Sequence, residues 1–395
     1  MGNLLNKSVN DFLCRKAEFF RCTKAVKNAV KSISTRPSRT HKTSAVLSCA
    51  AVVTSDRRIL SNVVIPQHDY HLPSGVISTL LCVVQKALDD AGTSVQDVDG
   101  IAYTREPGMT GCLSVGSNAM RTLAAALKKP LDGLDHMQAH ALTPFLTETE
   151  PADMLPTFPF LSLLVTAGNT LLLLVKSPRD SKILAATKDM TIGGAIEKVA
   201  RSLKLPRGEP GLGASLEEYL RKGPPEGYVI EKDYEIPLYS TPMPGRLEFS
   251  FASERSDTDR FLREREEDVD ECTGYAVAYA FQKTIVPQLE GKLKLALRAC
   301  RQDRVPIKHL VVSGGVASNM FLRQTRVVRV VKEQDEYNPI ELIYPPVSLC
   351  TDNAAIIAWA LIERFLTGDT DPYSTNLVPK WSVEYMFPAN RKPIS

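Results

Sequence analysis

Strand patterns alternate with helix patterns along this chain, and the alternation limits the fold more than any other feature. Short apolar runs are followed by longer amphipathic stretches over residues 44–130 and again over residues 307–368. Such an alternation favours an α/β fold in which helices cover the sheets. Paired apolar runs around short turns, at residues 55–58 and 167–170, predict a β-hairpin in each half. We therefore expect an α/β fold of two related lobes.

The composition excludes several classes of protein. Of the 395 residues, 44% are hydrophobic and 24% are charged, which is ordinary for a globular chain with a sizeable core. The eight cysteines include no C-x-x-C pair, which argues against a disulfide framework or a zinc ribbon and indicates a reducing compartment. No apolar run approaches the roughly 20 residues of a membrane-spanning helix. The sequence therefore predicts no membrane span.

The first 41 residues differ in charge from the rest of the chain. They contain nine Lys and Arg against two acidic residues, a net of +7, whereas the whole chain has a net charge of +3. A basic, acid-poor and Ser-containing start is typical of a mitochondrial transit peptide. A disordered basic tail is the alternative. We predict a transit peptide over residues 1–41 and a location in the mitochondrial matrix.

The stretch GLDHMQAHALTP places His136 and His140 four residues apart in a chain with six histidines. On a helix this spacing puts both rings on one face, where they can bind one divalent ion. Between them stand Met137, Gln138 and Ala139, so the glutamate of the H-E-x-x-H zinc peptidases is missing. A structural pair of histidines is the alternative, because a metal needs further ligands from elsewhere in the chain.

A candidate third ligand is Asp352, in the stretch SLCTDNAAIIAWA. It follows a strand pattern and two prolines, a position where sites form in α/β sheets. An aspartate at the start of a helix is also commonly its N-cap. The position alone therefore leaves two interpretations open, a ligand and a cap.

Two glycine-containing turns have features of nucleotide or anion binding. VVSGGVASN, residues 311–319, has the pattern of a strand, a glycine pair and a helix start, so its backbone can approach an anion. Asn319 could then hydrogen-bond a base or a ribose. TAGNT, residues 166–170, is a second candidate for holding a phosphate, with a plain β-turn as the alternative. Neither turn is a Walker A motif, because both lack G-K-[ST].

Cations recur every three residues after the second glycine turn, at Arg323, Arg326, Arg329 and Lys332. This spacing predicts a basic stripe along one helix face. A solvated face is the usual explanation of such a stripe, and a track for a phosphate backbone is the functional one. No aromatic residue interleaves with it, so it gives no argument for base stacking.

Taken in order, these motifs resemble one family closely. The blocks GIAYTREPGMTG, GLDHMQAHALTPFL, FPFLSLLVTAGNT, HLVVSGGVASNMFLR and YPPVSLCTDNAAIIAWA are similar to those of the TsaD-like tRNA threonylcarbamoyladenosine transferases, once called O-sialoglycoprotein endopeptidases. The resemblance covers about residues 42–365. It implies a two-lobed actin/sugar-kinase/Hsp70-like (ASKHA) fold that holds a nucleotide and a metal ion between the lobes.

The resemblance also implies a reaction and a division of the chain. The threonylcarbamoyl group would move from threonylcarbamoyl-AMP to N6 of adenosine 37 in tRNAs that read codons beginning with A. The first lobe would span residues 42–160 together with a helix at 353–366, and the second lobe residues 161–352, before a tail over 367–395. The basic start fits the mitochondrial branch of the family, whose members are implied to act as homodimers.

Carried over by position, His136, His140 and Asp352 become the ligands of one divalent metal ion, with Zn, Fe and Mg as candidates. The ion would act as a Lewis acid and a template for the adenylate while the adenine amine attacks. The residues implied to contact the adenylate are Leu164, Val165, Thr166, Ala167, Gly168, Glu197, Gly211 and Asn319.

The sequence departs from the family pattern where acidic residues are expected. The family's E-T-S-x-D-D-T block reads KTSAVLS, with Lys42 for the glutamate and Val46 and Leu47 for the aspartates, and Gly194 replaces another acid. Such carboxylates normally help to place charge near phosphates. Two hypotheses therefore stay open, an active transferase and a degenerate paralogue that binds metal, nucleotide or tRNA without catalysis.

Two further activities are disfavoured by the same motifs. A metallopeptidase lacks its base, because the H-E-x-x-H glutamate is absent. A plain sugar kinase or ATPase of the same fold does not explain the H-x-x-x-H pair.

Overall fold

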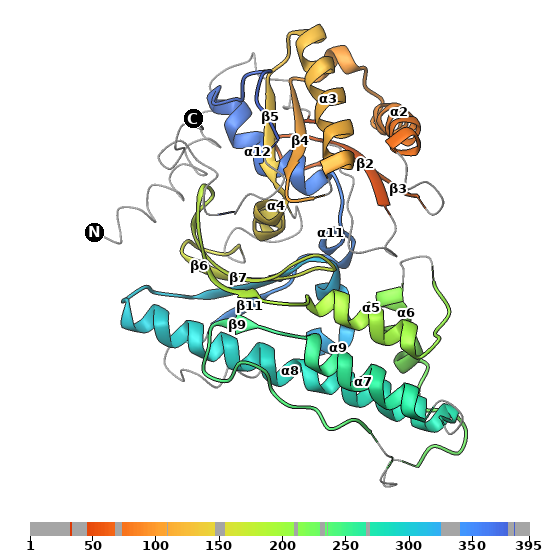
Figure 1. Cartoon of the computed structure of the whole chain (residues 1–395). Helices are drawn as coiled ribbons and strands as arrows, with labels where there is room; N and C mark the ends of the chain where they lie inside the picture. The colour runs from red at the N-terminus through yellow and green to blue at the C-terminus, as the bar shows by residue number, and fades with distance from the viewer. Residues whose placement is uncertain are drawn as a thin grey trace.

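Two β-sheets, each covered by helices, form two lobes in the computed structural model (Figure 1). The α/β class and the two-lobed organisation predicted from the sequence are confirmed. The structure describes these residues: 32–33, 46–67, 73–108, 110–146, 155–208, 212–229, 234, 236–265, 269–324, 340–377 and 383.

The first sheet has five strands in the order β3-β2-β1-β4-β5. Its strands are β1 (Ser32–Ile33), β2 (Val46–Val53), β3 (Ile59–Gln67), β4 (Gly100–Glu106) and β5 (Leu131–Asp135). β2 and β3 form the predicted antiparallel hairpin, while β4 and β5 run parallel to each other. β4 and β5 are buried along their whole length, as apolar strands covered on both faces are.

The centre of this sheet comes from the range predicted to be a transit peptide. Strand β1 lies between β2, to which it is antiparallel, and β4, to which it is parallel. Ser32 pairs with Val53 on one side and with Gly100 on the other. Removal of all of residues 1–41 would therefore take a strand from the middle of the first sheet.

In the part of the chain that the structure describes, four helices belong to the first lobe: α2 (Pro73–Asp90), α3 (Thr110–Leu127), α4 (His136–Leu142) and α12 (Ala355–Thr367). Gly92 has a left-handed backbone (φ 57°) just after α2, a conformation in which helices commonly end. α12 comes from the far end of the sequence and packs against α4, β2 and β4. Short 3-10 turns occur at η2 (Val95–Asp97) and η3 (Thr143–Leu146).

The second sheet has six strands in the order β11-β10-β6-β7-β8-β9. Its strands are β6 (Phe160–Val165), β7 (Thr170–Ser177), β8 (Asp180–Thr187), β9 (Glu248–Phe249), β10 (His309–Ser313) and β11 (Glu341–Ile343). β6 is antiparallel to β7 and parallel to β10, just as β1 is antiparallel to β2 and parallel to β4. The two sheets therefore share one order over five strands, in agreement with the two related lobes expected from the sequence.

The remaining helices lie in the second lobe: α5 (Ile192–Ser202), α6 (Leu212–Arg221), α7 (Ala252–Glu264), α8 (Glu271–Gln302), η5 (Gly315–Ser318), α9 (Met320–Gln324) and α11 (Val347–Cys350). α5 and α8 contribute apolar side chains to the main core of this lobe, together with β6 and β7. α8 is the longest helix described and contains Pro287.

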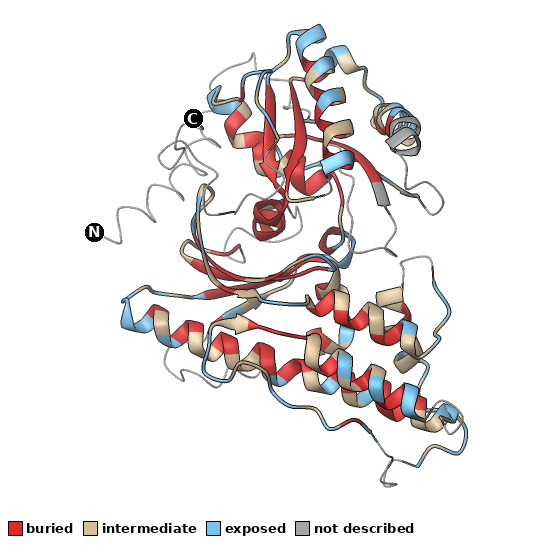
Figure 2. Cartoon of the chain, viewed as in Figure 1, coloured by how far each residue is buried: buried red, intermediate tan, exposed pale blue. Residues whose placement is uncertain are grey.

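A separate apolar cluster joins the two lobes. It contains side chains from β2, β4, α4 and α12 of the first lobe and from β6, β7 and β10 of the second. α4 packs against both β6 and β10 and is fully buried between the lobes (Figure 2). This packing holds α4 at the place where the two lobes meet, and with it the side chains on its other face.

The described part of the predicted tail packs on the first lobe. Asp371 accepts a hydrogen bond from the Gly133 N–H (3.3 Å) and forms an ion pair with Arg105 (3.6 Å). Tyr373 donates its hydroxyl to the carbonyl of Lys129 (2.9 Å). Among the described residues no helix combines the length and apolar character needed to cross a membrane.

Candidate functional site

The turn from β5 into α4 carries both histidines, and we call residues 135–140 the histidine corner. Asp135 caps the helix, because its carboxylate accepts hydrogen bonds from the N–H groups of Met137 (2.6 Å) and Gln138 (3.3 Å). His136 and His140 then lie on one face of α4, with ring centroids 4.3 Å apart and planes at 90°. The helical i, i+4 geometry predicted from the sequence is confirmed, and both rings are fully buried.

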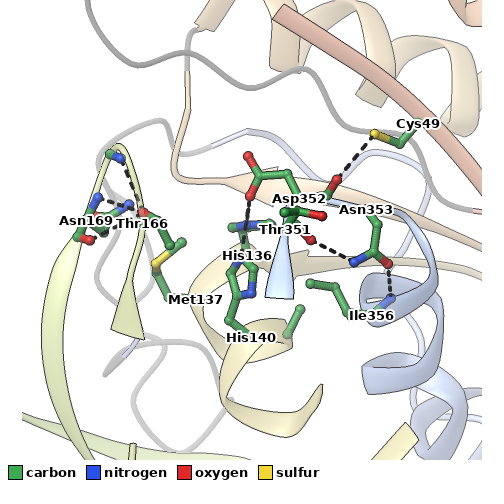
Figure 3. A network of polar contacts seen from close by, with 12 residues as sticks. Cys49, His136, Met137, His140, Thr166, Asn169, Thr351, Asp352, Asn353 and Ile356 are labelled. Carbon is green, nitrogen blue, oxygen red and sulfur yellow. Dashed lines mark hydrogen bonds and ion pairs between the residues drawn. The ribbon is translucent and has the colours of Figure 1, made fainter. Parts of the chain in front are cut away.

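Asp352 faces these two rings from the loop before α12 (Figure 3). The N-cap position of α12 is Ala354 and not Asp352, and the side chain that bonds the first turn of the helix is that of Asn353. The Asn353 side-chain oxygen accepts a hydrogen bond from the Ile356 N–H (3.2 Å), and its amide group donates to the carbonyl of Thr351 (2.8 Å). With the first turn bonded by Asn353, the carboxylate of Asp352 is available to the histidines.

The three donor groups meet at one point. Asp352 Oδ1 lies 3.1 Å from His136 Nε2 and 3.4 Å from His140 Nε2, and ligand atoms of all three residues lie within 4.8 Å of one another. Donor atoms about 2.0–2.2 Å from a shared ion lie about 2.8–3.6 Å apart at octahedral or tetrahedral angles. The distances therefore fit one divalent ion. They also fit hydrogen bonds between imidazole and carboxylate, so a binding measurement must separate the two.

A buried carboxyl group lies beside the histidine corner. Glu106 ends β4, pairs in register with Asp135, and is fully buried. Neither carboxyl oxygen of Glu106 has a hydrogen-bond partner among the described residues. Burial, with a smaller contribution from the charge of Asp135, raises the pKa of Glu106 to about 9. Glu106 is therefore protonated at neutral pH when no cation is near.

A second buried acid lies on β5. Arg364 of α12 donates to the Asp132 carboxylate (2.6 Å), and Asp371 lies on the other side of the guanidinium (3.8 Å). Burial raises the pKa of Asp132 to about 9 although Arg364 opposes the shift. These charged contacts link β5, α12 and the tail behind the histidine corner.

Two turns of the second lobe form a further part of the site, and we call them together the glycine corner: residues 166–169 after β6 and residues 314–319 after β10. Gly314 has φ 103°, and a Cβ there would lie 2.5 Å from the Val165 carbonyl oxygen. A Cβ on Gly193, at the start of α5, would lie 2.6 Å from the Ala167 Cα. Backbone therefore packs directly on backbone at both places, as only glycine permits.

Most residues implied to contact the adenylate lie in or next to the glycine corner. Leu164, Val165 and Thr166 are buried at the end of β6, whereas Ala167 and Gly168 are exposed at the turn. The Thr166 hydroxyl accepts hydrogen bonds from the N–H groups of Gly168 (3.2 Å) and Asn169 (2.8 Å). The Thr166 side chain therefore holds the backbone of this turn.

The other residues implied to contact the adenylate have partners within the protein or lie outside the described residues. The Asn319 side-chain oxygen accepts a hydrogen bond from the Leu322 N–H (3.1 Å) and so caps α9, while Glu197 on α5 forms an ion pair with Arg201 (3.1 Å). Gly194 donates its N–H to Thr191 and brings no carboxylate. Gly211 and Lys42 lie outside the described residues.

The basic stripe predicted after the glycine turn is not supported at its first member. Arg323 points back into the protein, where its guanidinium donates to the carbonyls of Ala317 (2.7 Å) and Pro345 (3.0 Å). α9 ends at Gln324, and the three later cations of the stripe lie outside the described residues. Arg323 is therefore neither part of a solvated face nor a free phosphate contact.

Sequence reasoning missed the buried charges beside the histidine corner. Glu106 and Asp132 stand in strand segments that are buried along their whole length, GIAYTRE and LDGLD. An acidic residue in a segment that reads as a buried strand was the available signal, because such residues are rarely fully buried without a partner or a function.

The chain matches the family model of tRNA N6-adenosine threonylcarbamoyltransferase, TsaD, over residues 58–359. It is 37% identical over 345 residues to the tRNA N6-adenosine threonylcarbamoyltransferase of Sphingopyxis alaskensis, covering 85% of this chain and 92% of the relative. It is 35% identical to the enzyme of that name from Clostridium beijerinckii, covering 84% of this chain and 93% of the relative.

A solved structure is also similar. A provisionally named N-acetylglucosamine kinase from Porphyromonas gingivalis matches with a TM-score of 0.40 at 14% sequence identity, covering 85% of this chain and 99% of that one. Given the match to the family model and the extent of the similarity to its curated relatives, this chain belongs to the TsaD family of tRNA N6-adenosine threonylcarbamoyltransferases.

Proposed function

We propose that this enzyme transfers the threonylcarbamoyl group from threonylcarbamoyl-AMP to N6 of adenosine 37 in tRNAs that read codons beginning with A. Membership of the TsaD family supports the reaction class and tRNA as the substrate. The observation that carries the assignment of the site is the convergence of His136, His140 and Asp352 on one point between the lobes. One divalent metal ion per subunit is the cofactor we assign to that point.

Within this proposal the two lobes have different tasks. His136 and His140 are held rigidly by α4, and Asp352 is the more accessible ligand, with 21% of its side chain exposed against none for the histidines. A substrate would thus reach the metal position from the side of Asp352. The bound ion would supply Lewis-acid polarisation of a carbonyl or phosphoryl oxygen. The glycine corner would hold the adenylate through its backbone and through Asn319.

The test compares two histidine variants of the full-length chain, His140→Gln and His309→Gln. His309 is a buried histidine on β10 that pairs with Thr157 and Glu341, so it provides a matched control away from the metal position. Each protein is titrated with Zn²⁺ by calorimetry, then incubated with threonylcarbamoyl-AMP and an ANN-decoding tRNA, whose nucleosides are analysed by mass spectrometry. The full chain is used because β1 lies within residues 1–41.

We expect the wild type and His309→Gln to bind one ion and to form threonylcarbamoyladenosine. His140→Gln should lose both properties, with metal affinity lower by at least about 100-fold, because two ligands do not hold an ion that needs three. Undiminished metal binding by folded His140→Gln would refute the ligand assignment. A folded, metal-loaded wild type that forms no product would instead support the degenerate paralogue, which the loss of acids at Val46, Leu47 and Gly194 favours.

We further propose that the protein acts in the mitochondrial matrix and that its leader ends before Ser32. The net charge of +7 over residues 1–41 supports a leader, and the pairing of Ser32 with β2 and β4 supports the earlier cleavage point. N-terminal sequencing of the protein recovered from mitochondria would contradict this boundary if the first residue followed Ile33. The homodimer stays a prediction, which sedimentation equilibrium of the full chain would check.

A further inference from the structure

One arginine side chain contacts both the glycine corner and the loop that carries Asp352. Arg323 Nε donates to the Ala317 carbonyl (2.7 Å), inside the glycine turn after β10. Its Nη2 donates to the carbonyl of Pro345 (3.0 Å) and to the Sγ of Cys350 (3.1 Å). The guanidinium also lies over the ring of Tyr344, 4.7 Å from its centroid. Four contacts thus hold a single planar group in place.

These contacts lie at both ends of the loop formed by residues 344–352, which we call the aspartate loop. Tyr344 and Pro345 begin it at the end of β11, and Cys350 ends the short helix α11, two residues before Asp352. α11 also packs against η5 of the glycine turn. Cys350 is fully buried, and its Sγ is near the Pro345 carbonyl (3.5 Å), so the two ends of the loop meet at the guanidinium.

The position of Asp352 depends on this loop. Asp352 is partly exposed, and its backbone carbonyl has a weak contact with the Cys49 thiol (3.9 Å). The histidines, by contrast, are fixed by the fully buried helix α4. Of the three proposed ligands, the carboxylate is therefore the one whose placement relies most on contacts outside its own helix or strand.

We propose that Arg323 is a positioning residue that fixes the aspartate loop against the glycine corner, and so sets Asp352 in place for metal binding and residues 314–319 in place for the nucleotide. The inference rests on the proposed function, because it takes Asp352 as a ligand. A lysine cannot replace this arrangement, since one ammonium group lacks the planar fork that reaches three acceptors in different directions.

The first experiment measures Co²⁺ affinity without nucleotide and AMP affinity without metal, for the wild type, Arg323→Ala, Arg323→Lys and Arg298→Ala. Arg298 is exposed on α8 and serves as the matched loss of an arginine. We expect Arg323→Ala to weaken both affinities by about 10-fold, the size typical of residues that orient metal ligands. Arg323→Lys should recover only a small part of each loss, and Arg298→Ala should match the wild type.

The second experiment is a double-mutant cycle with Asp352→Asn. If Arg323 acts on the metal through Asp352, then Arg323→Ala should reduce Co²⁺ affinity in the wild type but cause little further loss in Asp352→Asn. Equal losses in both backgrounds would overturn the proposal and assign Arg323 to general stability. So would unchanged Co²⁺ and AMP affinities in a folded Arg323→Ala protein.

If Arg323→Ala does not fold, the affinities of Arg323→Lys test whether Arg323 is a positioning residue. An Arg323→Lys protein with wild-type affinities would overturn the proposal, whereas a several-fold loss of both would support it. Failure of the proposed function is distinguishable, because it would appear as Co²⁺ binding that survives His140→Gln. Loss of Co²⁺ binding in His140→Gln together with wild-type Co²⁺ and AMP affinities in Arg323→Ala would overturn only the inference about Arg323.

Discussion

The histidine corner and the glycine corner both follow a buried parallel strand, yet they are built from different parts of the chain. At the histidine corner the proposed metal ligands are the side chains of His136 and His140, and the backbone serves to form a capped helix. At the glycine corner the backbone itself is packed, and Gly314 has no side chain because Val165 occupies the space. A substitution should therefore damage function at the first corner and stability at the second.

The largest effect on stability is expected when one methyl group is added at the glycine corner. Gly314→Ala places a Cβ 2.5 Å from the Val165 carbonyl oxygen and imposes φ 103° on a residue with a side chain. We expect the free energy of unfolding to fall by roughly 2–4 kcal/mol, from the clash and the backbone strain together. Urea unfolding followed by circular dichroism measures this change.

The neighbouring glycine is the control for that experiment. A Cβ on Gly315 would meet no heavy atom within 4 Å, so Gly315→Ala should stay within about 0.5 kcal/mol of the wild type. Equal effects of the two substitutions would show that the glycine corner is not limited by close backbone contact.

The two corners also differ in how far the sequence predicts them. His136 and His140 are visible as a pair because helical periodicity converts a spacing of four into one face. The role of Asp352 needed the structure, because a cap and a ligand look alike at a helix start and Asn353 stands beside it. At the glycine corner the glycines are visible, but which carbonyl lies against Gly314 depends on a contact between residues far apart in the sequence.

Charges were the hardest features to place from the sequence. A spacing of three assigned Arg323 to an exposed stripe, but periodicity gives no direction of burial for a helix as short as α9. The strand β1 was equally hidden, since two residues in a basic segment give no alternating pattern. Tertiary pairing supplies the information in both cases. The α/β class, the two hairpins and the helix with the histidine pair needed only local patterns, and these predictions are confirmed.

A second prediction concerns Glu106, the buried acid beside the histidine corner. It tests an effect on stability at the corner where we expect substitutions to act mainly on function. Between the ordinary pKa of 4.5 and the native value of about 9, native Glu106 keeps a proton that the unfolded chain has released. The native state binds more protons in this range, so Glu106 lowers stability as pH rises, at about 1.4 kcal/mol per pH unit. The neutral variant Glu106→Gln removes this slope.

We expect Glu106→Gln to match the wild type near pH 4.5 and to exceed its stability by about 2 kcal/mol at pH 8, a value below the full linkage because buried groups relax. The measurement is urea unfolding between pH 4.5 and 9 with a chelator present, since a bound cation would itself lower the pKa of Glu106. Glu218→Gln, at an exposed glutamate on α6, is the control for the loss of a carboxylate. A constant gap for Glu106→Gln at all pH values would contradict the raised pKa.

The smallest effect is expected where the two kinds of role are adjacent in the sequence, at Asp352 and Asn353. Asn353→Ala removes the oxygen that accepts the Ile356 N–H, so the free energy of unfolding should fall by about 1 kcal/mol while Co²⁺ affinity changes less than about threefold. Asp352→Ala should do the reverse, losing Co²⁺ binding with a stability change below about 0.5 kcal/mol. Calorimetric Co²⁺ titration and thermal unfolding of both variants measure the two quantities. If Asp352→Ala lowers the free energy of unfolding more than Asn353→Ala does, Asp352 is a structural residue. The assignment of function to one residue and stability to its neighbour would then be wrong.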